Sequence, residues 1–152
     1  MASSVVVPVD FSEGTEAVLA EAAKLAKALG AKVWLLHVAV AEPDFVGFEV
    51  GPVYIRDSVA EELREAHQKI QRHQEALREQ GLDVTAMLLP GEAAEKIVAK
   101  ARELKSDLIV LGSHGHGALY HLLMGSVCAA VLKDAPCPVV VVPAKTGREA
   151  AD

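Results

Sequence analysis

The chain has 152 residues, a net charge of -6 and a hydrophobic content of 51%. This length predicts one domain, and the hydrophobic fraction suffices for a sheet covered by helices. The acidic balance disfavours nucleic acid as a partner, because its phosphates require clustered lysine and arginine. The apolar runs are shorter than the ~20 residues that span a bilayer. No signal-peptide pattern opens the chain, and Cys128 and Cys137 lack metal-type spacing. We therefore expect a cytoplasmic protein without a membrane partner or a disulfide.

Five short runs rich in β-branched residues alternate with helical patterns along the chain. Three of these runs are continuously apolar, which is typical of strands buried on both faces of a parallel sheet. Because proline removes a hydrogen-bond donor, we place Pro8 at the carboxyl end of the first strand. The predicted strands are Val5–Val9, Val33–Val38, Asp83–Leu88, Leu108–Leu111 and Val139–Val142.

Four helices are expected between these strands. Ser58 and Glu61 match a capping box and mark the start of the second helix, which ends at Gly81. The other predicted helices are Ser12–Leu29, Glu92–Leu104 and Ser126–Lys133. This order predicts an α/β fold, an open parallel sheet with helices on both faces. A single domain would occupy residues 1–145, and residues 146–152 would form a frayed tail.

The stretch Ala39–Asp57 is long for a loop and contains Phe45, Phe48 and Tyr54. Long ordered loops are often functional lids. The rings could equally cap the edge of the core, so both interpretations remain open.

The glycine-rich segment from Gly112 to Ser126 carries the strongest chemical signal. It begins where a buried strand ends and finishes where a helix begins. In open α/β sheets, ligands bind outside the carboxyl ends of the strands, and a helix N-terminus offers N–H groups that suit phosphate. The segment matches neither the P-loop nor the dinucleotide-binding spacing. It favours an anion-binding loop over a purely structural turn.

The spacing Gly112-x2-Gly115-x9-Gly125-Ser126 resembles the nucleotide-binding loop of the universal stress protein family, in its ATP-binding subgroup. Residues 8–12, 36–38 and 135–140 resemble that family's first, second and last strands. The likeness covers roughly residues 3 to 143. It implies a Rossmann-like sheet of the adenine nucleotide alpha hydrolase kind, with strand order 3-2-1-4-5. In that order Asp10 and Gly112 would face each other across one crevice.

The resemblance also implies which residues hold the nucleotide. Asp10 and the backbone of Val38 would contact adenine, the first glycines would follow ribose and phosphate, and the start of the last helix would cradle the phosphates. Asp10 could instead be a helix-capping carboxylate near Ser12. The cofactor would be ATP, or ADP or AMP, with Mg²⁺ as the companion of a triphosphate. The implied cofactor-binding positions are Pro8, Val9, Asp10, Val38, Gly112, Ser113, Gly115, Gly125, Ser126 and Val127.

The loop from Gly112 to Ser126 contains no lysine or arginine. Related sequences often carry a basic residue near positions 116 and 121, where this chain has histidine. Neutral hydrogen bonds contribute only ~0.5–1.5 kcal/mol each, so we expect micromolar or weaker affinity. We hypothesise that His114, His116 or His121 supplies a pH-dependent charge. Equal ATP affinity about one pH unit either side of the ordinary histidine pKa would contradict this hypothesis.

The remaining histidines suggest no catalyst. A metal site built from the loop histidines is disfavoured, because a glycine-rich loop lacks the rigid support of metal ligands. His67 and His73 are expected to be solvated on the second helix, and His37 to be packed or hydrogen-bonded at a strand end. No catalytic residue and no metal ligand is assigned.

These observations favour a nucleotide-binding regulatory protein of the stress response. The resemblance implies a homodimer that pairs through the last strand, Val139–Val142, an apolar edge. A slow ATP hydrolase is the first alternative, although the loop lacks a charged group that would stabilise the transferring phosphoryl. The second alternative is a protein-interaction module of the same fold without nucleotide.

Overall fold

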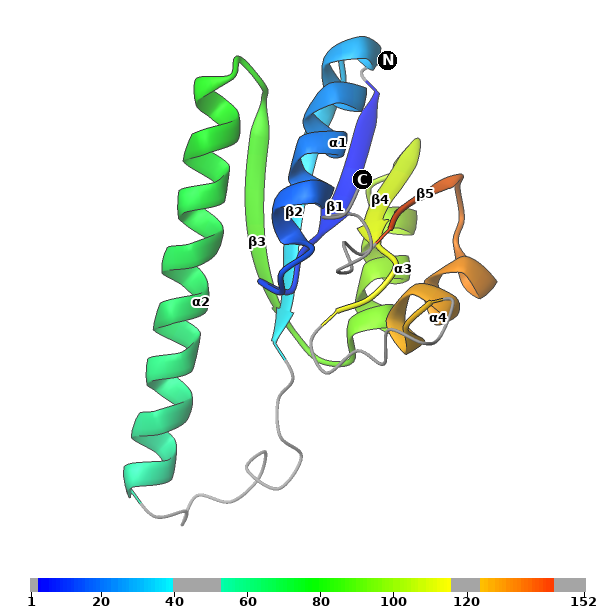
Figure 1. Ribbon diagram of the computed structural model, residues 1–152. Helices are drawn as coiled ribbons and strands as arrows, with labels where there is room; N and C mark the ends of the chain where they lie inside the picture. The colour runs from blue at the N-terminus through cyan, green and yellow to red at the C-terminus, as the bar shows by residue number, and fades with distance from the viewer. Residues whose placement is uncertain (1–2, 40–52, 116–123, 144–152) are drawn as a thin grey trace, which may run out of the picture.

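The computed structural model describes residues 3–39, 53–115 and 124–143. Strands and helices alternate along the whole of this part of the chain (Figure 1). The strands are β1 (Ser4–Pro8), β2 (Lys32–Ala39), β3 (Val84–Pro90), β4 (Leu108–Gly112) and β5 (Val139–Val142). The helices are α1 (Thr15–Leu29), α2 (Val53–Glu79), α3 (Ala93–Glu103) and α4 (Ser126–Asp134).

The five strands form one parallel sheet in the order β3-β2-β1-β4-β5. This confirms the order implied by the resemblance. The central strand β1 pairs with β2 through Val7 and Leu35, and with β4 through Val5 and Leu108. Pro8 closes β1 at its carboxyl end, where the missing donor costs the ladder little.

Side chains that alternate along the strands build a core on each face of the sheet. On one face, Val7 packs with Ile70 beneath α1 and α2. On the other, Val6 packs with Ile97 and Val131 beneath α3 and α4. Figure 1 shows α1 in front of the sheet and α3 and α4 behind it, so helices cover both faces as predicted.

The first helix begins three residues later than the predicted Ser12. The carboxylate Oδ1 of Asp10 accepts the N–H of Ser12 at 3.0 Å, and Phe11 has a left-handed φ of 62°. These residues therefore form a turn that must end before α1 starts at Thr15. Asp10 caps this turn and not the helix, because the N-cap of α1 is Gly14 without a side-chain hydrogen bond.

The predicted start of the second helix at Ser58 is wrong. Helix α2 begins at Val53, so Ser58 and Glu61 lie inside it. Glu61 instead accepts a hydrogen bond from Arg64 at 2.6 Å, one turn further along the helix. A serine three residues before a glutamate therefore does not by itself mark a helix start.

The expected loop from Ala39 to Asp57 is shorter than predicted at both ends. Ala39 belongs to β2, and Tyr54 and Asp57 belong to α2. Phe45 and Phe48 lie outside the described residues, as does the tail expected at residues 146–152.

Within the described ranges, none of the helices has the length and apolarity needed to cross a membrane. Cys128 and Cys137 are free thiols.

Candidate functional site

The two central strands end side by side and their chains then diverge. From β1 the chain turns into α1 on one face of the sheet, whereas β4 leads towards α4 on the other face. This divergence is the topological switch point at which open α/β sheets form a ligand crevice. The predicted site residues Asp10 and Gly115 follow β1 and β4 at this point.

The carboxylate of Asp10 lies directly against the backbone of Gly115. A side-chain carbon on Gly115 would overlap Oδ2 of Asp10 and would lie 3.3 Å from its Cγ. The other oxygen, Oδ1, accepts the N–H of Ser12. Asp10 thus joins the turn after β1 to the glycine loop after β4, and only glycine fits at position 115 without displacing the carboxylate.

The described ends of the glycine loop are tied together by backbone hydrogen bonds. Gly125 donates its N–H to the carbonyl of Ser113 at 2.6 Å, and Ser113 donates its own N–H to Val142 of β5 at 2.8 Å. The side chain of Ser113 is buried, and its hydroxyl lies 2.9 Å from Nδ1 of His114. The backbone of Ser113 therefore joins the two described ends of the loop to each other and to β5.

Gly112 and Gly125 both lie where the backbone is crowded. A side-chain carbon on Gly112 would approach the carbonyl of His114 to 3.3 Å and Val18 to 3.4 Å. One on Gly125 would lie 3.3 Å from the carbonyl of Ser113. The described ends of the loop therefore pack closely where the resemblance implies a phosphate contact.

Helix α4 begins at the end of this loop without a side-chain cap. Its N-cap, Gly125, is extended and its carbonyl accepts the N–H of Ala129 at 3.0 Å. Ser126 and Val127, the first two residues of the helix, are exposed. Exposed N–H groups and the positive end of the helix dipole are an arrangement that attracts anions. Burial raises the pKa of the Cys128 thiol in the same turn, which makes it a poor nucleophile.

The residues of the expected adenine end lie on β1 and β2. Pro8 ends β1, and Val38 is half-buried in β2. Val9 is buried, and both of its backbone groups are bonded to β2. Its N–H donates to Leu36 at 2.8 Å, and its carbonyl accepts a hydrogen bond from His37 at 2.8 Å. Val9 can therefore shape a pocket but has no backbone donor left for a ligand.

The histidines differ from expectation in one case. His37 is hydrogen-bonded as predicted, and His67 is exposed. His73 was expected to be solvated, but it is half-buried and its ring stacks on Phe11, with centroids 6.1 Å apart. The expectation failed because it considered the spacing of two histidines on α2 and not the turn after β1 that packs against them.

The described residues contain no group of three His, Cys, Asp or Glu side chains that could hold a metal. His116 and His121 lie outside the described residues, so the hypothesis of a pH-dependent loop charge stays a prediction. His114 is described, and its Nδ1 contacts the Ser113 hydroxyl.

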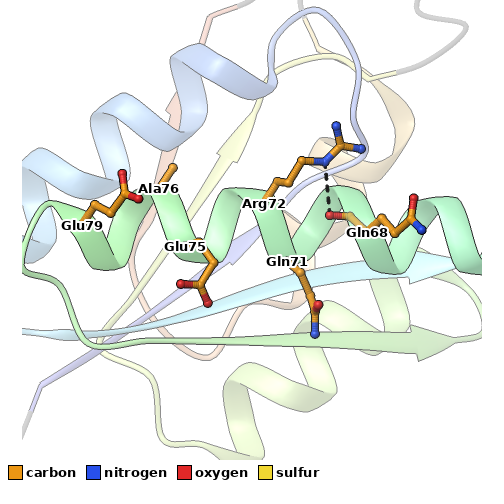
Figure 2. Close-up of a pocket in the computed structure, with 6 residues that line it drawn as sticks. All are labelled: Gln68, Gln71, Arg72, Glu75, Ala76 and Glu79. Carbon is orange, nitrogen blue, oxygen red and sulfur yellow. Dashed lines mark hydrogen bonds between the residues drawn. The ribbon is translucent and has the colours of Figure 1, made fainter.

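A shallow hollow runs along the outer surface of α2 (Figure 2). Within it, Arg72 donates from Nε to the carbonyl of Gln68 at 3.4 Å. All the side chains drawn there come from this one helix, so no second element supplies groups that converge on a ligand. Its lining residues are Gln68, Gln71, Arg72, Glu75, Ala76 and Glu79. The crevice beside Asp10 is therefore the stronger candidate.

Comparisons with known proteins agree with this architecture. A model of the Universal stress protein family matches residues 1–143. A universal stress protein of Methanocaldococcus jannaschii is 35% identical over 140 residues, which is 91% of this chain and 80% of that protein. The solved structure of a second one from that organism has a TM-score of 0.80 and 30% identity, covering 96% and 99% of the two chains.

A further solved structure is that of the universal stress protein from Archaeoglobus fulgidus in complex with dAMP. It is 26% identical to this chain, with a TM-score of 0.68 and coverage of 92% of this chain and 97% of that one. The family match spans all five strands and both ends of the glycine loop. This chain belongs to the universal stress protein family.

Proposed function

We propose that this protein binds an adenine nucleotide in the crevice between the ends of β1 and β4 and acts as a regulatory protein of the stress response. The contact between the Asp10 carboxylate and Gly115 carries the proposal. It brings the turn after β1 against a glycine loop that leads to the uncapped start of α4. The dAMP complex of the Archaeoglobus fulgidus relative supports a nucleotide as the ligand.

The residues present fit such a ligand. Adenine would lie near Asp10 and the backbone of Val38, against the apolar surface of Pro8 and Val9. The ribose and first phosphate would follow Gly112 and Gly115, with Ser113 supporting the loop from inside. The outer phosphates would lie against Gly125, whose own N–H is bonded to Ser113, and would accept hydrogen bonds from the N–H groups of Ser126 and Val127 at the start of α4. Backbone N–H groups at a helix start bind phosphate without requiring a side-chain charge.

The charge around the crevice makes ATP binding dependent on a cation. Asp10 and Glu13 are acidic, and the sequence from Gly112 to Ser126 has no lysine or arginine. Mg²⁺ would offset the repulsion between these carboxylates and a triphosphate. We therefore expect removal of Mg²⁺ to weaken ATP binding more than AMP binding.

Calorimetric titration of the purified chain with ATP, ADP and AMP, with and without Mg²⁺, tests the proposed function directly. The same sample, denatured and analysed for released small molecules, shows whether nucleotide is carried through purification. No released nucleotide and no binding heat for any of the three would refute the proposal. Steady release of phosphate from ATP in the same mixture would show that the protein is also a slow ATP hydrolase.

Replacing Asp10 by asparagine should lower nucleotide affinity about fivefold to tenfold. Hydrogen bonds to a charged partner contribute ~1.5–3 kcal/mol, against ~0.5–1.5 kcal/mol for neutral ones. The asparagine oxygen can still accept the N–H of Ser12, so the turn should persist. The affinity of the Asp10→Asn variant for AMP, measured by calorimetry, checks this expectation.

Asp107→Asn is the matched control for that variant. Asp107 accepts the N–H of Ser4 at 2.8 Å, at the amino ends of β1 and β4, away from the crevice. The two variants change the net charge equally, but only Asp10 borders the crevice. Equal losses of affinity in both would mean that overall charge matters and the Asp10 contact does not.

We further propose that two copies pair through β5. This strand is the edge of the sheet, and its four valines are only partly buried. Val127 and Leu132 of α4, the helix that precedes β5 in the chain, are 39% and 40% exposed. An apolar edge strand is protected from uncontrolled pairing when a second copy covers it. Light scattering that gives the mass of one chain at micromolar concentration would refute this pairing.

A further inference from the structure

The turn that carries Asp10 has an unusual backbone. Phe11, the next residue, has a left-handed φ of 62°. Among the described residues, Lys105 is the other non-glycine residue in this region of conformational space. A bulky side chain adopts this conformation only where its surroundings impose it, and such residues often lie at functional sites.

His37 holds the beginning of this turn from β2. Its Nδ1 lies 2.8 Å from the carbonyl oxygen of Val9. A carbonyl can only accept, so Nδ1 must be the donor and must carry a proton. Together with the bond from the Val9 N–H to Leu36, this fixes both backbone groups of Val9, the residue that precedes Asp10.

The ring of His37 also packs against Phe11. The two ring centroids are 4.4 Å apart and their planes are inclined by 34°. On α2, His73 stacks on the same phenyl ring, and Nζ of Lys69 lies 5.6 Å from its centroid. These contacts surround Phe11 with groups that aromatic rings favour and oppose its return to an ordinary conformation.

We propose that His37 is a positioning residue of the nucleotide crevice, which holds the Asp10 carboxylate against Gly115 through its hydrogen bond to Val9. This inference rests on the proposed function and assigns a role that His37 exerts without touching the ligand. The anchored carbonyl belongs to the peptide that joins Val9 to Asp10. Rotation of this peptide would swing the Asp10 side chain away from Gly115, so the side-chain donor of His37 fixes where the carboxylate points.

Two substitutions distinguish the effect of the His37 hydrogen-bond donor from the effect of its aromatic ring. His37→Asn keeps an N–H near the position of Nδ1 but removes the aromatic contact. His37→Phe keeps a ring against Phe11 but removes the donor. We expect His37→Phe to weaken AMP binding about threefold to tenfold, the effect of one lost neutral hydrogen bond. His37→Asn should stay within about twofold of the wild type.

His67→Phe is the matched control, because His67 is an exposed histidine on α2. It should leave AMP affinity unchanged. An AMP affinity for His37→Phe equal to that of the control would overturn the proposal. Equal weakening by His37→Asn and His37→Phe would overturn it too, because packing and not the donor would then be responsible.

A second readout does not depend on nucleotide. The N–H of Ser12 donates to Asp10, so its hydrogen exchange reports whether the carboxylate keeps its place. We expect His37→Phe to accelerate exchange at Ser12 but not at Val33, whose N–H bonds to Asp83 at the opposite, amino end of the strands. If the wild type binds no nucleotide, the proposed function fails, and the exchange at Ser12 still decides the role of His37.

The wild-type protein offers a measurement that requires no variant. In its neutral form, the imidazole of His37 should carry its proton on Nδ1. Nitrogen chemical shifts of the ring distinguish the two tautomers. A proton found on Nε2 in place of Nδ1 would overturn the proposal even if His37→Phe does not fold.

Discussion

Replacing Gly115 by valine is expected to abolish detectable nucleotide binding, a loss of at least about a hundredfold in affinity. The first side-chain carbon would occupy the position of the Asp10 oxygen that lies against Gly115, and the branched chain would fill the space beyond it. Asp10 would have to leave its place and break the bond to Ser12. Titration with AMP and ATP checks this result.

The sheet should survive the same substitution. Gly115 lies outside both core clusters, so the free energy of unfolding should change far less than the affinity. Gly14→Val is the matched control, because a side-chain carbon there would approach nothing closer than Ser12 Oγ at 4.0 Å. It should lower stability slightly through a poorer helix start. Retention of wild-type affinity by the Gly115→Val variant would contradict the placement of nucleotide in this crevice.

Replacing Leu35 by alanine is expected to lower the free energy of unfolding by ~2–5 kcal/mol. Leu35 is fully buried in β2, between Val7 of β1 and Ala86 of β3. The substitution removes apolar contact and leaves a cavity that the flanking strands cannot fill. Chemical denaturation followed by circular dichroism measures the change.

Leu29→Ala provides the matched comparison, since Leu29 ends α1 and is 51% exposed. The same truncation there should cost less than about 1 kcal/mol. Similar losses in the two variants would mean that β2 is not at the centre of the core. The Leu35→Ala variant should bind nucleotide more weakly only under conditions in which it is partly unfolded.

Much of the fold could be predicted because its signals are local. Continuous apolar runs such as residues 5–7 identify buried strands, and Gly30 marks the end of α1 by its left-handed conformation. The strand order could not be derived in this way, because it depends on which strands lie side by side in space. It came from the resemblance. The start of α2 was misplaced because a serine three residues before a glutamate also occurs inside helices, where Glu61 pairs with Arg64.

The candidate site was predictable only where its residues are close in sequence. The spacing from Gly112 to Ser126 indicated the loop, but the contact of Asp10 with Gly115 required the strand order. The bond from His37 to Val9 joins residues 28 positions apart and leaves no periodic signal. Its geometry follows from the pairing of β1 with β2, which brings the end of one strand beside a side chain of the other.

Helix α2 is much longer than the strand that follows it. Its 27 residues span about 40 Å, whereas the seven residues of β3 span about 23 Å. Figure 1 shows the N-terminal turns of the helix extending beyond the end of the sheet. His73 and Lys69, which touch Phe11 beside the crevice, lie on this helix. A tilt of the helix about that contact would therefore move its first turn much further than the residues that lie beside the crevice.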